Sequence, residues 1–330
     1  MPNRKPGRTP AHAAAASSEG LPNPPIEPRS ATGRAAARLT LERQDPPEHL
    51  FRRLLSAYLS GARSFEVVER PRVSSATREV AREFCRRTRQ PQIVRDHGSV
   101  LTLTVTDERD PPDMDEALLR LGDDVLAFHR EAVESWDRLP LGDDGAWARR
   151  DDDVDRESWV LERRLAREER EGRAQARPAA AAWTIVRSLE RIADHAVTLG
   201  EVGPRLADLR TDRSPVRELR QLHRQAMTHL ADVLRSSDGS RANDLLDVGE
   251  ALVASGRSLA ERVLPAVGDG SMSPATAAAV ARALEAIGRT VAYSQDIAQA
   301  CFDRSLSAPP RTELGRATPP PQLAAGTVPA

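Results

Sequence analysis

The chain has 330 residues, of which 48 are basic and 49 acidic, so its net charge at pH 7 is only -1. This balance excludes a strongly basic nucleic-acid coat and an acidic tail protein. Hydrophobic residues make up 39% of the chain and aromatic residues 3%, which favours packed helices over a β-sandwich. Lys5 is the only lysine, so the Gly-Lys-Ser/Thr of a phosphate-cradling P-loop cannot be present.

The composition of both ends indicates disorder. Residues 1–36 and 308–330 are rich in Pro, Ala, Ser and Gly and nearly lack large apolar side chains, so burial cannot offset the entropy of ordering them. No apolar run is long enough to cross a bilayer, and Cys85 and Cys301 form no Cys-x-x-Cys pair. These features predict a soluble, cytoplasmic protein with a folded middle and two disordered tails.

Residues 37–110 change period several times, which predicts a small α/β domain. The expected strands cover 38–42, 65–70, 92–95 and 100–106, and the expected helices cover 48–60 and 75–88. Residues 96–99 carry Asp and Gly, which suit a tight hairpin loop. The resulting order is β-α-β-α-β-β.

From residue 111 onward the pattern is helical. Six helices are predicted, over 113–137, 144–172, 177–210, 214–236, 239–263 and 273–306. The string Leu-Glu-Arg-Ile-Ala-Asp at 189–194 aligns with Leu-Glu-Ala-Ile-Gly-Arg at 284–289, which indicates an internal repeat of three helices. The predicted fold is therefore mainly α, with tandem three-helix bundles at 111–212 and 213–307 after the α/β domain.

Two pairs of acidic residues stand out in the first repeat. Asp151 and Asp155, and separately Glu190 and Asp194, are spaced i, i+4, which places each pair on one face of a helix. If the two helices run antiparallel, the four carboxylates can face one another and offer hard oxygen ligands to Mg, Mn, Ca or Fe. The alternative is a solvated acidic face, neutralised by neighbouring arginines such as Arg187.

The acidic residues belong to two longer strings. Asp-Asp-Asp-Val-Asp-Arg at 151–156 precedes Leu-Glu-Arg-Ile-Ala-Asp-His-Ala at 189–196, and together they resemble the PhoU family of phosphate-uptake regulators. The likeness spans about 113–306, and the α/β segment is similar to the N-terminal half of archaeal-type PhoU proteins. Such relatives often begin with a DNA-binding AbrB-like hairpin, but the tail here has no strands for one, so direct DNA binding is not expected.

The resemblance implies a function, a cofactor and partners. The function would be regulation of phosphate uptake and homeostasis through protein contact. The metal, implied as Fe, Zn, Mn or Mg, would be held by Asp151, Asp155, Glu190 and Asp194. The partners would be the ATPase of a phosphate ABC transporter and a membrane sensor kinase, so that the membrane is reached only through them, and a homodimer stays open.

The second repeat departs from this pattern. Arg289 stands where the first repeat has Asp194, and the same alignment places Leu246 and Glu250 opposite Asp151 and Asp155. Because an arginine repels a cation, we expect at most one metal site in the chain. Arg289 is expected to pair instead with Glu285 at i, i+4.

Several enzymatic classes lack their residues. A ferritin-like di-metal enzyme needs Glu-x-x-His, and a serine hydrolase needs Gly-x-Ser-x-Gly; neither occurs. His195 is turned about 100° from Asp194 on its helix and is interpreted as a packing residue. Arginines at 82–89 and 163–170 alternate with glutamates, which indicates ion-paired surfaces. The sequence predicts no enzyme; the alternatives to a metal-binding regulator are a helical scaffold without metal and a transcriptional regulator acting through the N-terminal domain.

Overall fold

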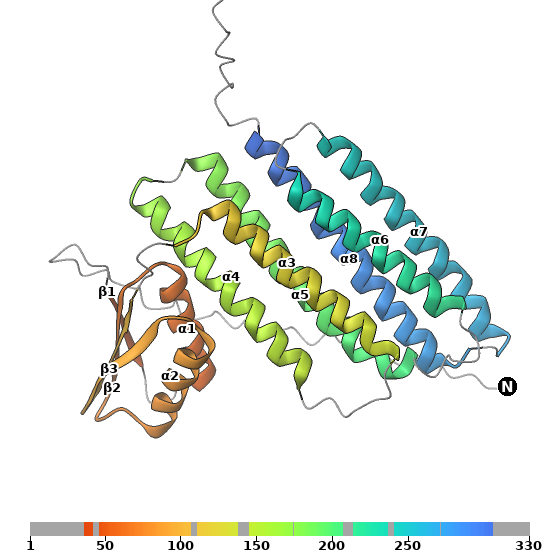
Figure 1. Ribbon diagram of the computed structural model, residues 1–330. Coiled ribbons are helices and arrows are strands. Elements are labelled where there is room, and N and C mark those ends of the chain that lie inside the picture. Colours follow the sequence, from red (N-terminus) through yellow and green to blue (C-terminus); the bar gives the residue numbers. More distant parts are fainter. Residues whose placement is uncertain are drawn as a thin grey trace, which may run out of the picture.

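The computed structural model describes residues 36–41, 46–106, 111–137, 145–173, 175–206, 214–236, 241–270 and 272–305. Apart from residue 36, where the first strand begins, the two predicted tails lie outside these ranges. Figure 1 shows two parts, a small domain of strands and short helices and a bundle of long helices. The predicted fold class, mainly α with an N-terminal α/β domain, is confirmed.

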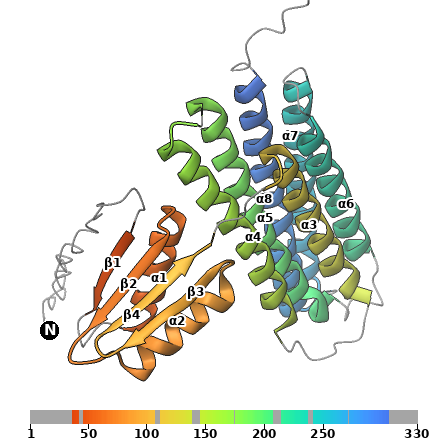
Figure 2. The same cartoon turned by 60° about the vertical axis from the view of Figure 1, so that its left-hand side comes forward.

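The α/β domain has the predicted order of elements. Its elements are β1 (Ala36–Leu41), α1 (Pro47–Leu59), β2 (Ser64–Glu69), α2 (Ser75–Arg87), β3 (Pro91–His97) and β4 (Val100–Val105). The strands lie in the order β1-β2-β4-β3, with β1 parallel to β2 and the other two pairs antiparallel. Both helices cover one face of this sheet (Figure 2).

The core of this domain forms between the sheet and the helices. Phe84 of α2 packs edge-on against Phe51, Tyr58 and Phe65, with ring centroids 6.0–6.1 Å apart. The hairpin differs from the prediction: β3 continues to His97, so the loop is a two-residue turn in which Gly98 has a φ of 60°. A side chain with a Cβ is disfavoured at that φ, which explains the glycine.

Six helices follow. They are α3 (Met114–Glu134), α4 (Ala146–Arg170), α5 (Ala176–Leu206), α6 (Ser214–Arg235), α7 (Ala242–Gly268) and α8 (Pro274–Ser305). Every predicted helix is present, with one sizeable difference at the end of α7. This helix extends five residues beyond the predicted end at 263 and includes Pro265, which lies in its last turn and cannot donate the hydrogen bond to the carbonyl four residues earlier. Within the described ranges, no helix combines the length and apolarity required to traverse a bilayer.

The two sets of three helices share one continuous core. The most extensive contact in the molecule joins α5 to α8, the third helices of the two sets. Small buried side chains, such as Ala193 and Ala196 on α5 and Ala283 and Ala286 on α8, allow this close approach. The helix that carries Glu190 and Asp194 is therefore also the central contact between the repeats.

Close packing against Trp147 predicts the effect of one glycine substitution. A Cβ at Gly200 would lie 2.5–2.7 Å from the indole of Trp147, which already stacks on Phe128. Gly200→Ala is expected to destabilise the protein by about 2 kcal/mol net, because overpacking a rigid ring exceeds the gain of about 1 kcal/mol in helix propensity. Urea unfolding measures this difference. Gly288→Ala on α8 is the matched control: its Cβ meets nothing within 4 Å, so it should not destabilise.

The α/β domain packs on α4. Arg163 of α4 is only 2% exposed, and its Nη1 donates hydrogen bonds to the carbonyls of Tyr58 and Ala62, both at 2.8 Å. Trp159, one turn earlier, packs against the core of the α/β domain. The interpretation of Arg163 as part of an ion-paired surface is therefore wrong, because the docked domain removes this side chain from water. α4 is thus packed between the α/β domain and the rest of the bundle (Figure 2).

Candidate metal centre

The acidic residues of α4 lie beside its buried stripe. Val154, Ser158 and Leu161 recur at helical spacing and face the bundle core. Asp151 and Asp155 flank this stripe and are half-buried, and the side chain of Asp155 is 18% exposed. Burial of the apolar stripe therefore holds both carboxylates at the edge of the contact between α4 and α5.

The acidic residues of α5 have an equivalent position. Ile192 and Ala193 are buried, and Glu190 and Asp194 lie on either side of them. Glu190 is half-buried, whereas Asp194 is the most open of the four. The tight turn after α4, where Gly172 has a φ of 68°, returns the chain antiparallel, so that the acidic stretches of α4 and α5 meet.

The pKa values show that these carboxyls are close enough to repel one another. Burial, followed by the charges of Asp155 and Asp194, raises the pKa of Asp151 to about 7. Burial likewise raises the pKa of Asp155 to about 7, assisted by Glu190 and Asp194. The same causes, burial first and then the charge of Asp194, raise the pKa of Glu190 to about 7. For Asp194 burial raises the pKa, and Arg191 opposes the rise.

The structure thus brings the four predicted residues into one electrostatically coupled group, which we call the acidic cluster (Asp151, Asp155, Glu190 and Asp194). The side chains are not arranged as a closed coordination shell. Among the residues with described positions, no three His, Cys, Asp or Glu side chains converge closely enough to hold a metal ion. Binding an ion here would require the carboxylates to move toward one another by rotation of their side chains.

An arginine from the α/β domain lies at the edge of the cluster. Arg87, the last residue of α2, contacts Asp152 at 2.5 Å and Asp155 at 3.9 Å. Its guanidinium also lies 5.4 Å from the ring of Phe51 and 5.8 Å from that of Trp159. This fixed positive charge lowers the pKa values of Asp151 and Asp155 and so offsets part of their repulsion.

Two residues that affect the electrostatics of the acidic cluster were not predicted from the sequence. Glu162, seven residues after Asp155, faces α5 and pairs with Arg187 at 3.4 Å; its charge raises the pKa of Glu190. The spacing of seven, two helical turns, was the available signal for Glu162. For Arg87 there was none, because it belongs to another domain, 65 residues before Asp152 in the sequence.

Among the described residues of the second repeat there is no equivalent cluster. Glu250, Glu285 and Arg289 are all exposed. The predicted pair is wrong: in the described part of the chain no ion pair joins Arg289 to Glu285. Both charges instead act on His195: after the larger effect of burial, Arg289 lowers the pKa of the imidazole and Glu285 raises it. His195 stacks on Tyr293 of α8 at 5.9 Å, as expected for a packing residue.

Fold and site together define a class of protein: a tandem-repeat helical bundle with one acidic cluster and an appended α/β domain. Residues 118–202 match the family model described as the PhoU domain. The match begins in α3 and ends in α5, so it contains the whole acidic cluster, and we assign this part of the chain to the PhoU domain family. Members of this family are regulators rather than enzymes. Neither the curated proteins nor the solved structures include a significant match.

Proposed function

We propose that this protein is a metal-responsive regulator of phosphate uptake and phosphate homeostasis, acting in the cytoplasm by protein contact. The PhoU domain at residues 118–202 supports the regulatory role. The observation that carries the metal proposal is the acidic cluster: four carboxyls held together on two helices, with pKa values raised by burial and mutual repulsion. A hard cation is the ligand that relieves such repulsion.

The carboxylates are of the chemical type that binds a cation, but they lie too far apart to coordinate one without moving. Carboxylate oxygens suit Fe, Mn or Mg, and Zn also accepts them. Asp151 and Asp155 would contribute from α4, and Glu190 and Asp194 from α5, with the bound ion supplying positive charge between the two helices. Because α4 also supports the α/β domain and α5 packs on α8, tightening the α4–α5 contact would change the geometry of both neighbours.

The proposed partners follow from the family: the ATPase of a phosphate ABC transporter and a membrane sensor kinase. Contact with these proteins would bring the regulator to the membrane without a segment of its own in the bilayer. The mechanism assigned to the chain's residues is therefore structural. The carboxylates would hold the ion, the change in the α4–α5 contact would alter the packing of the neighbouring helices, and the surface would contact the partner.

Metal analysis of two isosteric double variants tests the proposal. Wild-type protein dialysed against Mn²⁺, Fe²⁺, Zn²⁺ or Mg²⁺ is expected to retain one ion per chain of at least one metal, measured by mass spectrometry of the elements. Asp151→Asn with Asp194→Asn should abolish retention, because one carboxylate is lost from each helix. Unchanged metal content in this variant would contradict the proposal.

The control replaces acidic residues on the same helices but away from the cluster. Asp153 of α4 is exposed and pairs with Arg156, and Glu201 of α5 is exposed and pairs with Arg282. Asp153→Asn with Glu201→Gln should retain the ion. Wild-type protein that retains none of the four metals would favour the alternative, a helical scaffold that acts without metal.

A further inference from the structure

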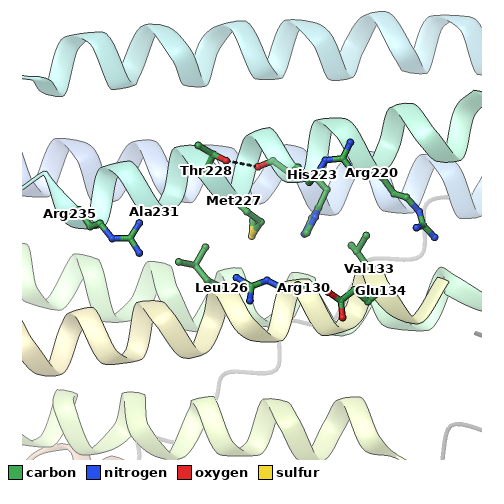
Figure 3. A pocket seen from close by; sticks show the side chains of 11 residues that line it. Leu126, Arg130, Val133, Glu134, Arg220, His223, Met227, Thr228, Ala231 and Arg235 are labelled. Carbon is green, nitrogen blue, oxygen red and sulfur yellow. Dashed lines mark hydrogen bonds between the residues drawn. The ribbon is translucent and has the colours of Figure 1, made fainter. Parts of the chain in front are cut away.

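A groove lies between α3 and α6, the first helices of the two repeats, outside the acidic cluster. Its volume is about 550 Å³, within the range of small-molecule sites. Leu126 of α3 and Met227 of α6 face each other across it (Figure 3). The groove is open to solvent, so a ligand can enter without a change in the fold.

Contacts at its two ends establish how the helices pair. Arg220 contacts Asp137 at 2.6 Å at one end, and Arg235 lies 3.8 Å from Asp123 at the other. Residue numbers rise along one helix as they fall along the other, so α3 and α6 are antiparallel. Counted from these contacts, Arg130 on α3 lies level with Met227 on α6, and Arg224 lies about one helical turn from that level, near Glu134.

The charge of the groove is positive. Four arginines (Arg130, Arg220, Arg224 and Arg235) and one acidic residue, Glu134, line it, and with the paired carboxylates of Asp123 and Asp137 the net charge is +1. The arginines at the ends have carboxylate partners. The two central ones, Arg130 and Arg224, form no side-chain ion pair or hydrogen bond with any residue that the structure describes.

The floor of the groove is fixed by two stacked histidines. His223 lies 4% exposed, with its ring 5.5 Å from that of His129 and its Nε2 3.4 Å from Nδ1 of His129. His129 Nε2 donates in turn to the carbonyl of Ile192 at 2.7 Å. This direction of donation leaves Nδ1 of His223, a residue of the groove lining, as an acceptor with no partner among the described residues.

We propose that the groove between α3 and α6 binds a phosphate-type oxyanion, held from both sides by the guanidinium groups of Arg130 and Arg224. Guanidinium forks bind phosphate oxygens in pairs, and two forks on opposite walls match a tetrahedral anion. Nδ1 of His223 accepts a hydrogen bond from a protonated phosphate oxygen. The volume exceeds that of one phosphate group, so a chain of phosphates also fits.

Calorimetric titration of the full-length, metal-free protein tests this inference with three probes: inorganic phosphate, tripolyphosphate and ATP. At least one is expected to bind with a stoichiometry of one. Binding of inorganic phosphate as tight as that of the other two assigns the groove to free phosphate. Tighter binding of tripolyphosphate and ATP assigns it to a phosphate chain.

Substitutions then locate the bound anion. Arg130→Ala and Arg224→Ala should each weaken binding at least about tenfold, because each removes a charge-assisted bidentate contact. Both side chains are exposed, so the fold should survive, as circular dichroism would verify. Arg217→Ala is the control, an exposed arginine of α6 outside the groove, and it should bind like the wild type.

Two results would overturn the inference: no binding of any probe at about 5 mM, or equal weakening by Arg217→Ala. The inference does not depend on the metal centre. The variant with Asp151→Asn and Asp194→Asn should bind the anion normally, so failure of one site is distinguishable from failure of the other.

Discussion

Arg163→Ala is expected to destabilise the protein by about 3 kcal/mol or more. Arg163 is buried, and one of its nitrogens serves the carbonyls of both Tyr58 and Ala62 in the other domain. Its guanidinium also lies 4.9 Å from the Tyr58 ring. Alanine would leave two buried carbonyls without this charged donor and a cavity where the side chain packs, and each loss is costly in a dry interface. The measurement is urea unfolding followed by circular dichroism.

The structural consequence should be local to the domain contact. Proteolysis is expected to cleave the variant between the α/β domain and α3 at a protease concentration that leaves the wild type intact. Arg120→Ala is the control, because Arg120 is 65% exposed and its pair with Glu116 on α3 contributes about 0.5 kcal/mol or less. A loss below about 1 kcal/mol for Arg163→Ala would contradict the assigned role.

Metal affinity should fall steeply with acidification. The pKa values of Asp151, Asp155 and Glu190 are raised to about 7 in the metal-free protein, so these groups are largely protonated at pH 6. A cation must displace those protons. The association constant for the retained metal should therefore drop at least about tenfold per pH unit below pH 6, one factor of ten for each proton released. Titration in buffers of different ionisation enthalpy measures the number of protons.

The same carboxyls predict the pH dependence of stability without metal. Between about pH 4 and 7 the folded chain holds protons that the unfolded chain has lost, so this contribution to stability falls as pH rises. Burial lowers the pKa of His129 to about 4 and of His223 to about 3, which gives a slope of opposite sign below pH 6.5. We therefore compare the free energy of unfolding of the variant with that of the wild type at each pH. This difference should shift in favour of Asp151→Asn with Asp194→Asn as pH rises from 5 to 8. A difference that does not change with pH would contradict the coupling.

The candidate site illustrates what helical periodicity reveals. The i, i+4 spacing of Asp151 with Asp155 and of Glu190 with Asp194 requires only that each segment be helical, and both segments are. That the two pairs meet depends on α4 and α5 running antiparallel, which from the sequence could be stated only as a condition. The distances between the four carboxylates could not be predicted from the sequence, because side-chain positions depend on how closely the two helices pack.

The order of strands and helices, the two repeats, the acidic pairs and the likeness to PhoU were all determined by the sequence alone, because periodicity, caps and short motifs are local. Tertiary structure decided the surroundings of those motifs: Arg87 lies beside Asp152, Arg163 lies inside the domain contact, and Arg130 and Arg224 line one groove. These neighbours are 65 to 105 residues apart. Only the packing of whole helices and domains brings residues so distant in sequence together, and no local pattern encodes it.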